Sequence, residues 1–221
     1  MEQLEHLPPG AFRRVDETPD ADFYRAPRLV THIDDAAITA VTQLYRELFP
    51  AQGAILDLMA SWVSHLPPEA SYRRVVGLGM NRAELMANPR LDAYVVQDLN
   101  RAPALPFADG EFDGAGICVS IQYLTQPDVV LREVSRVLRP GAPLAITFSN
   151  RCFPTKAVAV WQMLEDAGHA RLVEGYLRTA GSWAAIETLD RSPTRPGTDP
   201  LYAVIGRSLG PSTASATSSE T

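Results

Sequence analysis

Between residues 53 and 149, short runs of apolar residues alternate with segments that have the periodicity of helices. The runs are GAILDL (53–58), RRVVGLG (73–79), AYVVQD (93–98), GAGICVS (114–120) and PLAITFS (143–149). Each run is nearly continuous in apolar residues, which is typical of strands that helices cover on both faces. The pattern therefore predicts a parallel sheet whose strands are joined by right-handed crossovers.

Amphipathic helices account for the segments before, between and after these strands. They are expected over residues 34–50, 81–89 and 127–141, and one broken helix or two is expected over residues 155–180. Asp34 is the expected N-cap of the first helix, and Pro50 ends it. Pro127 stands in the opening turn of the third helix, and Pro140 with Gly141 stops it. This alternation predicts an α/β domain with helices on both faces of the sheet.

The two ends of the chain differ from this ordered centre. Residues 182–190 and 201–208 predict an antiparallel pair at the sheet edge, so the expected sheet has seven strands and is mostly parallel. The first 33 residues are rich in proline, have no stable period, and are expected to form an arm or lid over the body. Residues 208–221 are small and polar, which predicts a disordered tail. The expected domain spans residues 34–207.

Composition narrows the class of partner. A chain of 221 residues that is 46% apolar is long enough for one domain with a substantial core. Its net charge of -6 is spread along the chain without a basic stripe, so we expect no nucleic acid and instead a small-molecule substrate. No run approaches the roughly 20 apolar residues of a membrane helix, and the first ten residues, MEQLEHLPPG, lack a basic region followed by an apolar core. We expect a cytoplasmic monomer or homodimer that does not bind a membrane or hold a metal.

Ligands of open α/β sheets bind outside the carboxyl ends of the strands. The informative residues are therefore those that directly follow each expected strand. They lie at positions 57–63, 79–81, 98–100, 120–123 and 149–153.

Two long blocks in this part of the chain resemble a known family. They are QDLNRAPALPFADGEFDGAGICVSIQYL (97–124) and LREVSRVLRPGAPLAITFSN (131–150). In this order and spacing they resemble class I S-adenosylmethionine-dependent methyltransferases of the small-molecule, type 11-like branch. The resemblance implies a Rossmann-like fold, S-adenosyl-L-methionine as cofactor, and methyl transfer to a small-molecule acceptor. The stretches LDLMASWVSH, GMNRAEL and QDLN also resemble a subfamily with a non-glycine cofactor loop.

The resemblance assigns roles to two carboxylates. Asp98 matches the acid that accepts a hydrogen bond from the adenine amino group, with Leu99 beside the ring. Asp57 matches the acid that orients the cofactor loop and the methionine end of the cofactor. Each has a simpler interpretation: Asp98 also suits a turn or helix cap, and Asp57 suits a carboxylate that braces the loop.

The chain departs from the family at two places. The loop after the first strand is usually rich in glycine, but its three glycine positions hold Met59, Ser61 and Val63. The second strand usually ends in an acid that holds the ribose, but here it ends in Gly79. Asn81 is the expected neutral replacement, and Ser61 and Ser64 offer hydroxyl groups, so we interpret the loop as a rebuilt site. The expected cofactor-binding residues are Asp57, Met59, Ala60, Ser61, Gly79, Met80, Asn81, Asp98, Leu99 and Ser120.

An acceptor pocket is expected beside the cofactor. The arm brings Tyr24, Arg28 and His32 before the first long helix, a combination that suits a small polar or anionic substrate, or else an ordinary strap. His65 is a candidate base or a packing histidine, and Asn150 is a pocket residue or a helix cap. The expected catalytic residues are Tyr24, His32, His65, Gln122, Tyr123 and Asn150. The alternatives to methyl transfer are a cofactor-binding enzyme for another reaction and a non-catalytic binding protein.

Overall fold

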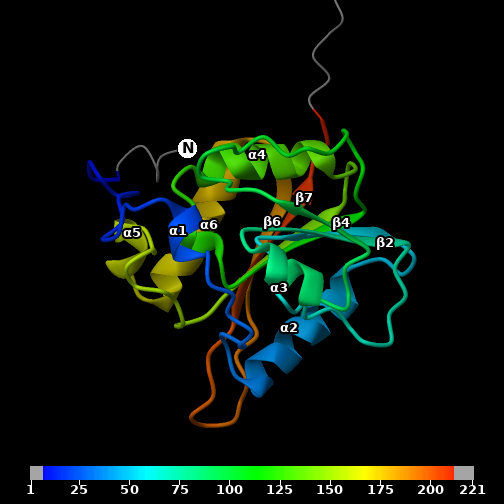
Figure 1. Ribbon diagram of the computed structural model, residues 1–221, viewed down its shortest axis with the longest axis horizontal. Helices are drawn as coiled ribbons and strands as arrows, with labels where there is room; N and C mark the ends of the chain where they lie inside the picture. Colours follow the sequence, from blue (N-terminus) through cyan, green and yellow to red (C-terminus); the bar gives the residue numbers. More distant parts are fainter. Residues whose placement is uncertain (1–6, 212–221) are drawn as a thin grey trace, which may run out of the picture.

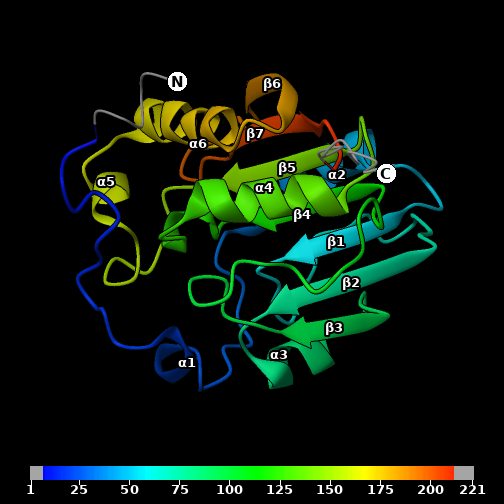
Figure 2. The same cartoon turned by 90° about the horizontal axis from the view of Figure 1, so that it is seen from above.

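The structure is a computed structural model that describes residues 7–211. Within them, one seven-stranded sheet has the order β3-β2-β1-β4-β5-β7-β6 (Figure 2). The strands are β1 (Ala54–Leu58), β2 (Arg74–Gly79), β3 (Ala93–Val96), β4 (Gly114–Cys118), β5 (Pro143–Phe148), β6 (Trp183–Asp190) and β7 (Tyr202–Ser208). Strands β1 to β5 are parallel, and β7 pairs antiparallel with both β5 and β6. The predicted sheet, including its antiparallel edge pair, is confirmed.

Helices cover both faces of the sheet. They are α1 (Asp20–Phe23), α2 (Asp35–Leu48), α3 (Arg82–Ala87), the short 3-10 helix η1 (Ile121–Tyr123), α4 (Pro127–Val137), α5 (Ala159–Gln162) and α6 (Asp166–Ala180). Figure 1 shows α4 and α6 on one side of the sheet and α2 on the other. The long C-terminal helical segment is thus two helices, and α1 was not predicted. No helix of the described residues is both long and apolar enough to cross a membrane.

The apolar positions of each helix explain how it packs. In α2, Val41, Leu44 and Tyr45 are buried against Ile55 of β1, and Asp34 caps the helix by accepting a hydrogen bond from the Ala37 N–H. In α4 the buried residues belong instead to the larger cluster on the opposite face. Burying one large aliphatic side chain contributes roughly 1.5–3 kcal/mol. The two clusters therefore hold the helices against the two faces of the sheet.

The arm, residues 7–33, is fixed to the body by buried charges. The Lys156 side chain is 0% exposed, and its Nζ lies 3.2 Å from the Asp20 carboxylate and donates to the Thr18 carbonyl at 2.7 Å. Arg14 Nη1 donates to both oxygens of Asp20, at 2.7 and 2.8 Å. The parallel strands point toward the edge where the arm, drawn in blue, passes (Figure 2). The expected tail from residue 212 onward lies outside the described residues.

Candidate functional site

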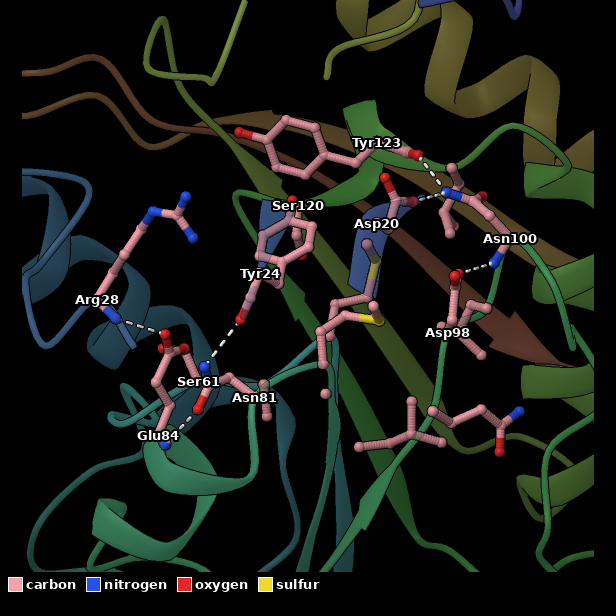
Figure 3. A pocket seen from close by; sticks show the side chains of 18 of the residues that line it. Asp20, Tyr24, Arg28, Ser61, Asn81, Glu84, Asp98, Asn100, Ser120 and Tyr123 are labelled. Atoms are coloured by element: carbon pink, nitrogen blue, oxygen red, sulfur yellow. Dashed lines mark hydrogen bonds between the residues drawn. The ribbon is translucent and has the colours of Figure 1, made fainter. Parts of the chain in front are cut away.

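A pocket lies between the arm and the segments that follow β1 to β4 (Figure 3). Its wall contains every expected cofactor-binding residue except Asp57, together with Tyr24, His32 and Tyr123 from the expected catalytic set. The arm also contributes Asp20 and Arg28. Residues that are far apart in the sequence therefore meet at the edge of the sheet where ligands of α/β proteins bind.

The turn after β1 is built without glycine, yet it needs a glycine-like conformation. Met59 has φ of 57°, in the left-handed region that costs most side chains about 1 kcal/mol or more. The turn directs the Ala60 N–H to the Leu78 carbonyl at 2.8 Å and extends the pairing of β1 with β2. As a result the Ala60 carbonyl oxygen lies only 2.1 Å from where a Cβ of residue 79 would stand. Gly79 is required by this close approach, which explains why no ribose acid can occupy that position.

Asp57 does not line the pocket, contrary to the role expected of it. Its carboxylate accepts a hydrogen bond from the Ser64 hydroxyl, and Asn88 Nδ2 donates to that Ser64 oxygen at 3.0 Å and to the Ser61 carbonyl at 2.9 Å. Burial raises the pKa of the Asp57 carboxyl group to about 7, although the bond from Ser64 favours the charged form. Asp57 therefore braces the loop from behind, as the simpler interpretation had it.

Asn81 lines the pocket, but its side chain is already fully bonded. As the N-cap of α3, its Oδ1 accepts from the N–H groups of Ala83 and Glu84. Its Nδ2 donates to the carbonyl groups of Tyr24, at 2.8 Å, and Arg25, at 3.1 Å. An amide group has two donor hydrogens and one acceptor oxygen with two lone pairs, so none remains for a ribose hydroxyl. The expected ribose contact of Asn81 is wrong, and the residue instead holds the arm against α3.

Glu84, which the sequence analysis missed, is the carboxylate on this side of the pocket. It is 8% exposed, and its two oxygens accept from the Ser61 hydroxyl and the Arg28 N–H, both at 2.6 Å. Among the described residues it has no cationic partner within ion-pair distance. It stands three residues after the capping asparagine, where a Glu typically faces back toward the helix N-terminus. The segment Asn81 to Glu84 is that sequence signal.

Asp98 retains the property that its expected role requires. One oxygen accepts from the Asn100 N–H at 2.9 Å, and the other accepts no hydrogen bond from residues 7–211. Leu99, beside it, is buried and also lines the pocket. The carboxylate thus caps its own turn and keeps an oxygen free for a ligand, so the two interpretations of Asp98 are compatible.

Ser120, which follows β4, is a buried hydroxyl group in the pocket wall. Its Oγ makes no hydrogen bond within the described part of the chain. Asn100, by contrast, is a structural bridge: its Nδ2 donates to Asp20 at 2.9 Å and to the Tyr123 carbonyl at 3.0 Å. The arm is therefore tied to the loops after both β3 and β4.

Aromatic side chains form the part of the wall nearest β5. The Tyr123 and Phe153 rings stack with their centroids 5.9 Å apart, and the Phe153 N–H donates to the Tyr123 hydroxyl at 2.9 Å. The His32 ring meets Phe153 edge-on at 5.2 Å, and burial lowers its pKa. Burial raises the pKa of the Tyr24 phenol. At neutral pH the rings of this wall are therefore uncharged.

Three expected catalytic residues do not line the pocket. Gln122 is fully buried, and its Nε2 donates to the Val119 carbonyl at 3.0 Å, so it braces the end of β4. Asn150 is exposed and lines a separate surface pocket with His169; it caps no helix, because the N-cap of α5 is Val158. His65 is absent from the pocket wall, and burial and, second, the charge of His32 lower its pKa to about 4. The expectation that these three residues line the pocket needs correction, because none of them is part of its wall.

Within residues 7–211, no group of three or more His, Cys, Asp or Glu side chains is arranged to hold a metal ion. The two cysteines of this part of the chain, Cys118 and Cys152, are not bonded to each other.

Comparisons with known proteins agree with the geometry. A family profile described as "Methyltransferase domain" matches residues 58–146. Methyltransferase GfsG of Streptomyces halstedii is 29% identical over 184 residues, which are 77% of this chain and 61% of that protein. The chain thus spans about three fifths of the length of that relative.

Solved structures show the same fold. The [4+2]-cyclase SpnF has a TM-score of 0.59 and 17% identity, covering 85% of this chain and 91% of its own. An S-adenosylmethionine-dependent methyltransferase from Mesorhizobium loti has a TM-score of 0.54 and 17% identity, covering 76% and 97%. The sheet order, the pocket at its carboxyl edge and the profile match lead to one conclusion: residues 58–146 match the methyltransferase domain family, and the chain has the fold of S-adenosylmethionine-dependent methyltransferases.

Proposed function

We propose that this chain transfers a methyl group from S-adenosyl-L-methionine, bound in the pocket described above, to a small-molecule acceptor. The observation that carries the proposal is the free oxygen of Asp98 in a pocket whose other walls come from the β1 turn, the β2 end and Ser120. These are the places that the family resemblance assigns to the cofactor.

In this proposal Asp98 accepts a hydrogen bond from the adenine amino group, and the apolar Leu99 packs beside the ring. Glu84 takes the ribose hydroxyls, because position 79 has no room for an acid and the amide of Asn81 is fully bonded. Each Glu84 oxygen has one protein donor, and a carboxylate oxygen accepts two hydrogen bonds. The Ser61 hydroxyl, which donates to Glu84, fixes the carboxylate in the pocket wall.

Methyl transfer needs alignment of the acceptor with the sulfonium methyl group more than it needs a strong acid. Tyr24, Tyr123 and Phe153 supply flat surfaces against which an acceptor is oriented, and they exclude water from the reacting groups. His32 has a lowered pKa and is therefore neutral at pH 7, so it is able to take a proton from an acceptor.

Calorimetric titration of the full chain with S-adenosylmethionine and S-adenosylhomocysteine tests the proposal. We expect micromolar binding, and Asp98→Ala should weaken it by about 1–3 kcal/mol, the cost of losing a buried hydrogen bond. Glu187→Gln, on the exposed outer strand β6, is the control and should bind like the wild type. Absence of binding by the folded wild-type protein would rule the cofactor out.

A second function remains compatible with the fold. The structural neighbour SpnF is named a cyclase, and a fold does not determine the reaction that it supports. Binding of S-adenosylmethionine without formation of S-adenosylhomocysteine across a broad acceptor panel would favour another reaction on the same cofactor site.

A further inference from the structure

Arg28 is an arm residue whose guanidinium group is enclosed by aromatic rings in the pocket. The guanidinium carbon lies 4.4 Å from the ring centroid of Phe23, 5.3 Å from that of Phe153 and 5.7 Å from that of Tyr24. Glu84 binds only the backbone N–H of Arg28, and Figure 3 shows the side chain extending away from that contact. Three aromatic rings therefore surround the guanidinium carbon in the wall of the pocket.

The hydrogen bonds of this guanidinium are incomplete. Its Nη2 donates to the Phe23 carbonyl at 2.9 Å, whereas Nη1 is buried and donates to no acceptor within residues 7–211. A buried charged donor without a partner is unfavourable. A ligand that supplies an acceptor at Nη1 would remove that penalty.

Arg28 differs from the two buried cations that fix the arm, Arg14 and Lys156, because both of those are paired with carboxylates. Arg14 is paired with both oxygens of Asp20, and Lys156 is paired with Asp16 and Asp20. Arg28 alone among these three has no carboxylate within ion-pair distance in the described part of the chain. Its position in the pocket wall places this unpaired charge where a ligand binds.

We propose that Arg28 binds a carboxylate group of a ligand in this pocket. A guanidinium matches a carboxylate through two parallel N–H to oxygen bonds, and stacking on rings suits Arg better than Lys. The carboxylate belongs either to the methionine part of the cofactor or to the acceptor, and the inference rests on the proposed function for the first source. The aromatic rings beside Arg28 favour a flat acceptor for the second.

Two sets of titrations distinguish the sources. The first compares S-adenosylhomocysteine with 5′-methylthioadenosine, which lacks the amino-acid carboxylate, against the wild type, Arg28→Gln and Arg28→Lys. If Arg28 holds the cofactor carboxylate, Arg28→Gln should weaken the binding of S-adenosylhomocysteine 10- to 100-fold and leave the affinity for 5′-methylthioadenosine unchanged. Arg28→Lys should recover part of the affinity for S-adenosylhomocysteine.

The second set uses benzoate, with neutral benzamide as its isostere, in the presence and absence of S-adenosylhomocysteine. If Arg28 holds the acceptor, the wild type should bind benzoate at least 10-fold more tightly than benzamide, and Arg28→Gln should abolish this preference. Arg25→Gln is the matched control, because Arg25 is an arm residue that is 78% exposed and paired with Asp22. Thermal unfolding of each variant verifies that it is folded.

The proposal is overturned if Arg28→Gln changes neither the affinity for S-adenosylhomocysteine nor the preference for benzoate, or if the wild type has no such preference and binds both nucleosides equally well. Failure of the proposed function has a different signature, namely that the wild type binds neither nucleoside. The benzoate titration without a nucleoside still tests Arg28 in that case.

Discussion

Replacing Gly79 by alanine would place a methyl group against the turn that follows β1. The added Cβ would lie 2.1 Å from the Ala60 carbonyl oxygen, 3.1 Å from the Ala60 carbonyl carbon and 3.3 Å from a Leu85 methyl group. The first two contacts are with backbone, which cannot rotate away. Non-bonded carbon atoms pack best at about 3.5–4.0 Å, so the turn would have to move back by about 1 Å.

The free-energy change follows from these contacts. Moving the turn breaks the bond from the Ala60 N–H to the Leu78 carbonyl, worth about 1 kcal/mol, and overpacking costs about 1–3 kcal/mol more. Alanine restricts the unfolded chain, which offsets about 0.4–1 kcal/mol. We therefore expect the free energy of unfolding to fall by about 2 kcal/mol. Urea denaturation followed by fluorescence measures this change.

A second variant tests whether the turn is the cause. Met59 holds the left-handed conformation of this turn, so Met59→Gly should let the turn relax. In that background the cost of Gly79→Ala should be smaller than in the wild type, giving a coupling energy of about 0.5 kcal/mol or more. An unfolding free energy of Gly79→Ala within about 0.5 kcal/mol of the wild type would refute the close approach.

Two further predictions concern buried charges outside the pocket. Lys156→Met removes the buried cation that faces Asp16 and Asp20 and should lower the free energy of unfolding by about 3 kcal/mol. Chemical denaturation measures this change. Unchanged stability would contradict the role of Lys156 in fixing the arm. Burial raises the pKa of Asp57 to about 7, above its unfolded value of about 3.9, so the folded protein keeps a proton that the unfolded chain releases. The stability of the folded protein should therefore fall as the pH rises from about 4 to 7, and Asp57→Asn should flatten this decline. If the free energy of unfolding of the wild type and of Asp57→Asn depended on pH in the same way, the raised pKa of Asp57 would be refuted.

The sequence was sufficient for the features that depend on neighbouring residues. The apolar runs mark the strands because both faces of the sheet are covered, and Asp34 marks the start of α2 because capping is a local interaction. The residues that follow each strand gather at one edge because parallel strands share a direction. For this reason Asp98, Ser120 and the turn from Met59 to Ser61 lie together in the pocket wall, and their cofactor-binding roles stay predictions.

The errors concern side chains whose partners are distant in the sequence. The amide of Asn81, expected to bind a ribose hydroxyl, donates instead to the carbonyl groups of Tyr24 and Arg25. Only the folded arm brings these carbonyl groups to Asn81. Gln122 and Asp57 turned out to brace loops because their side chains face the interior. No expectation was formed for Lys156, because only the fold brings Asp16 and Asp20 to it. Local patterns do not report such contacts.

A crystal structure of the full chain grown with saturating S-adenosylhomocysteine tests the central claim most directly. The account predicts the ligand in the pocket between the arm and the β1 to β4 loops, with the adenine amino group within hydrogen-bond distance of Asp98 and the ribose hydroxyls on Glu84. A structure in which the ligand is absent from this pocket, or in which the ribose is bound and Glu84 does not touch it, would contradict the account.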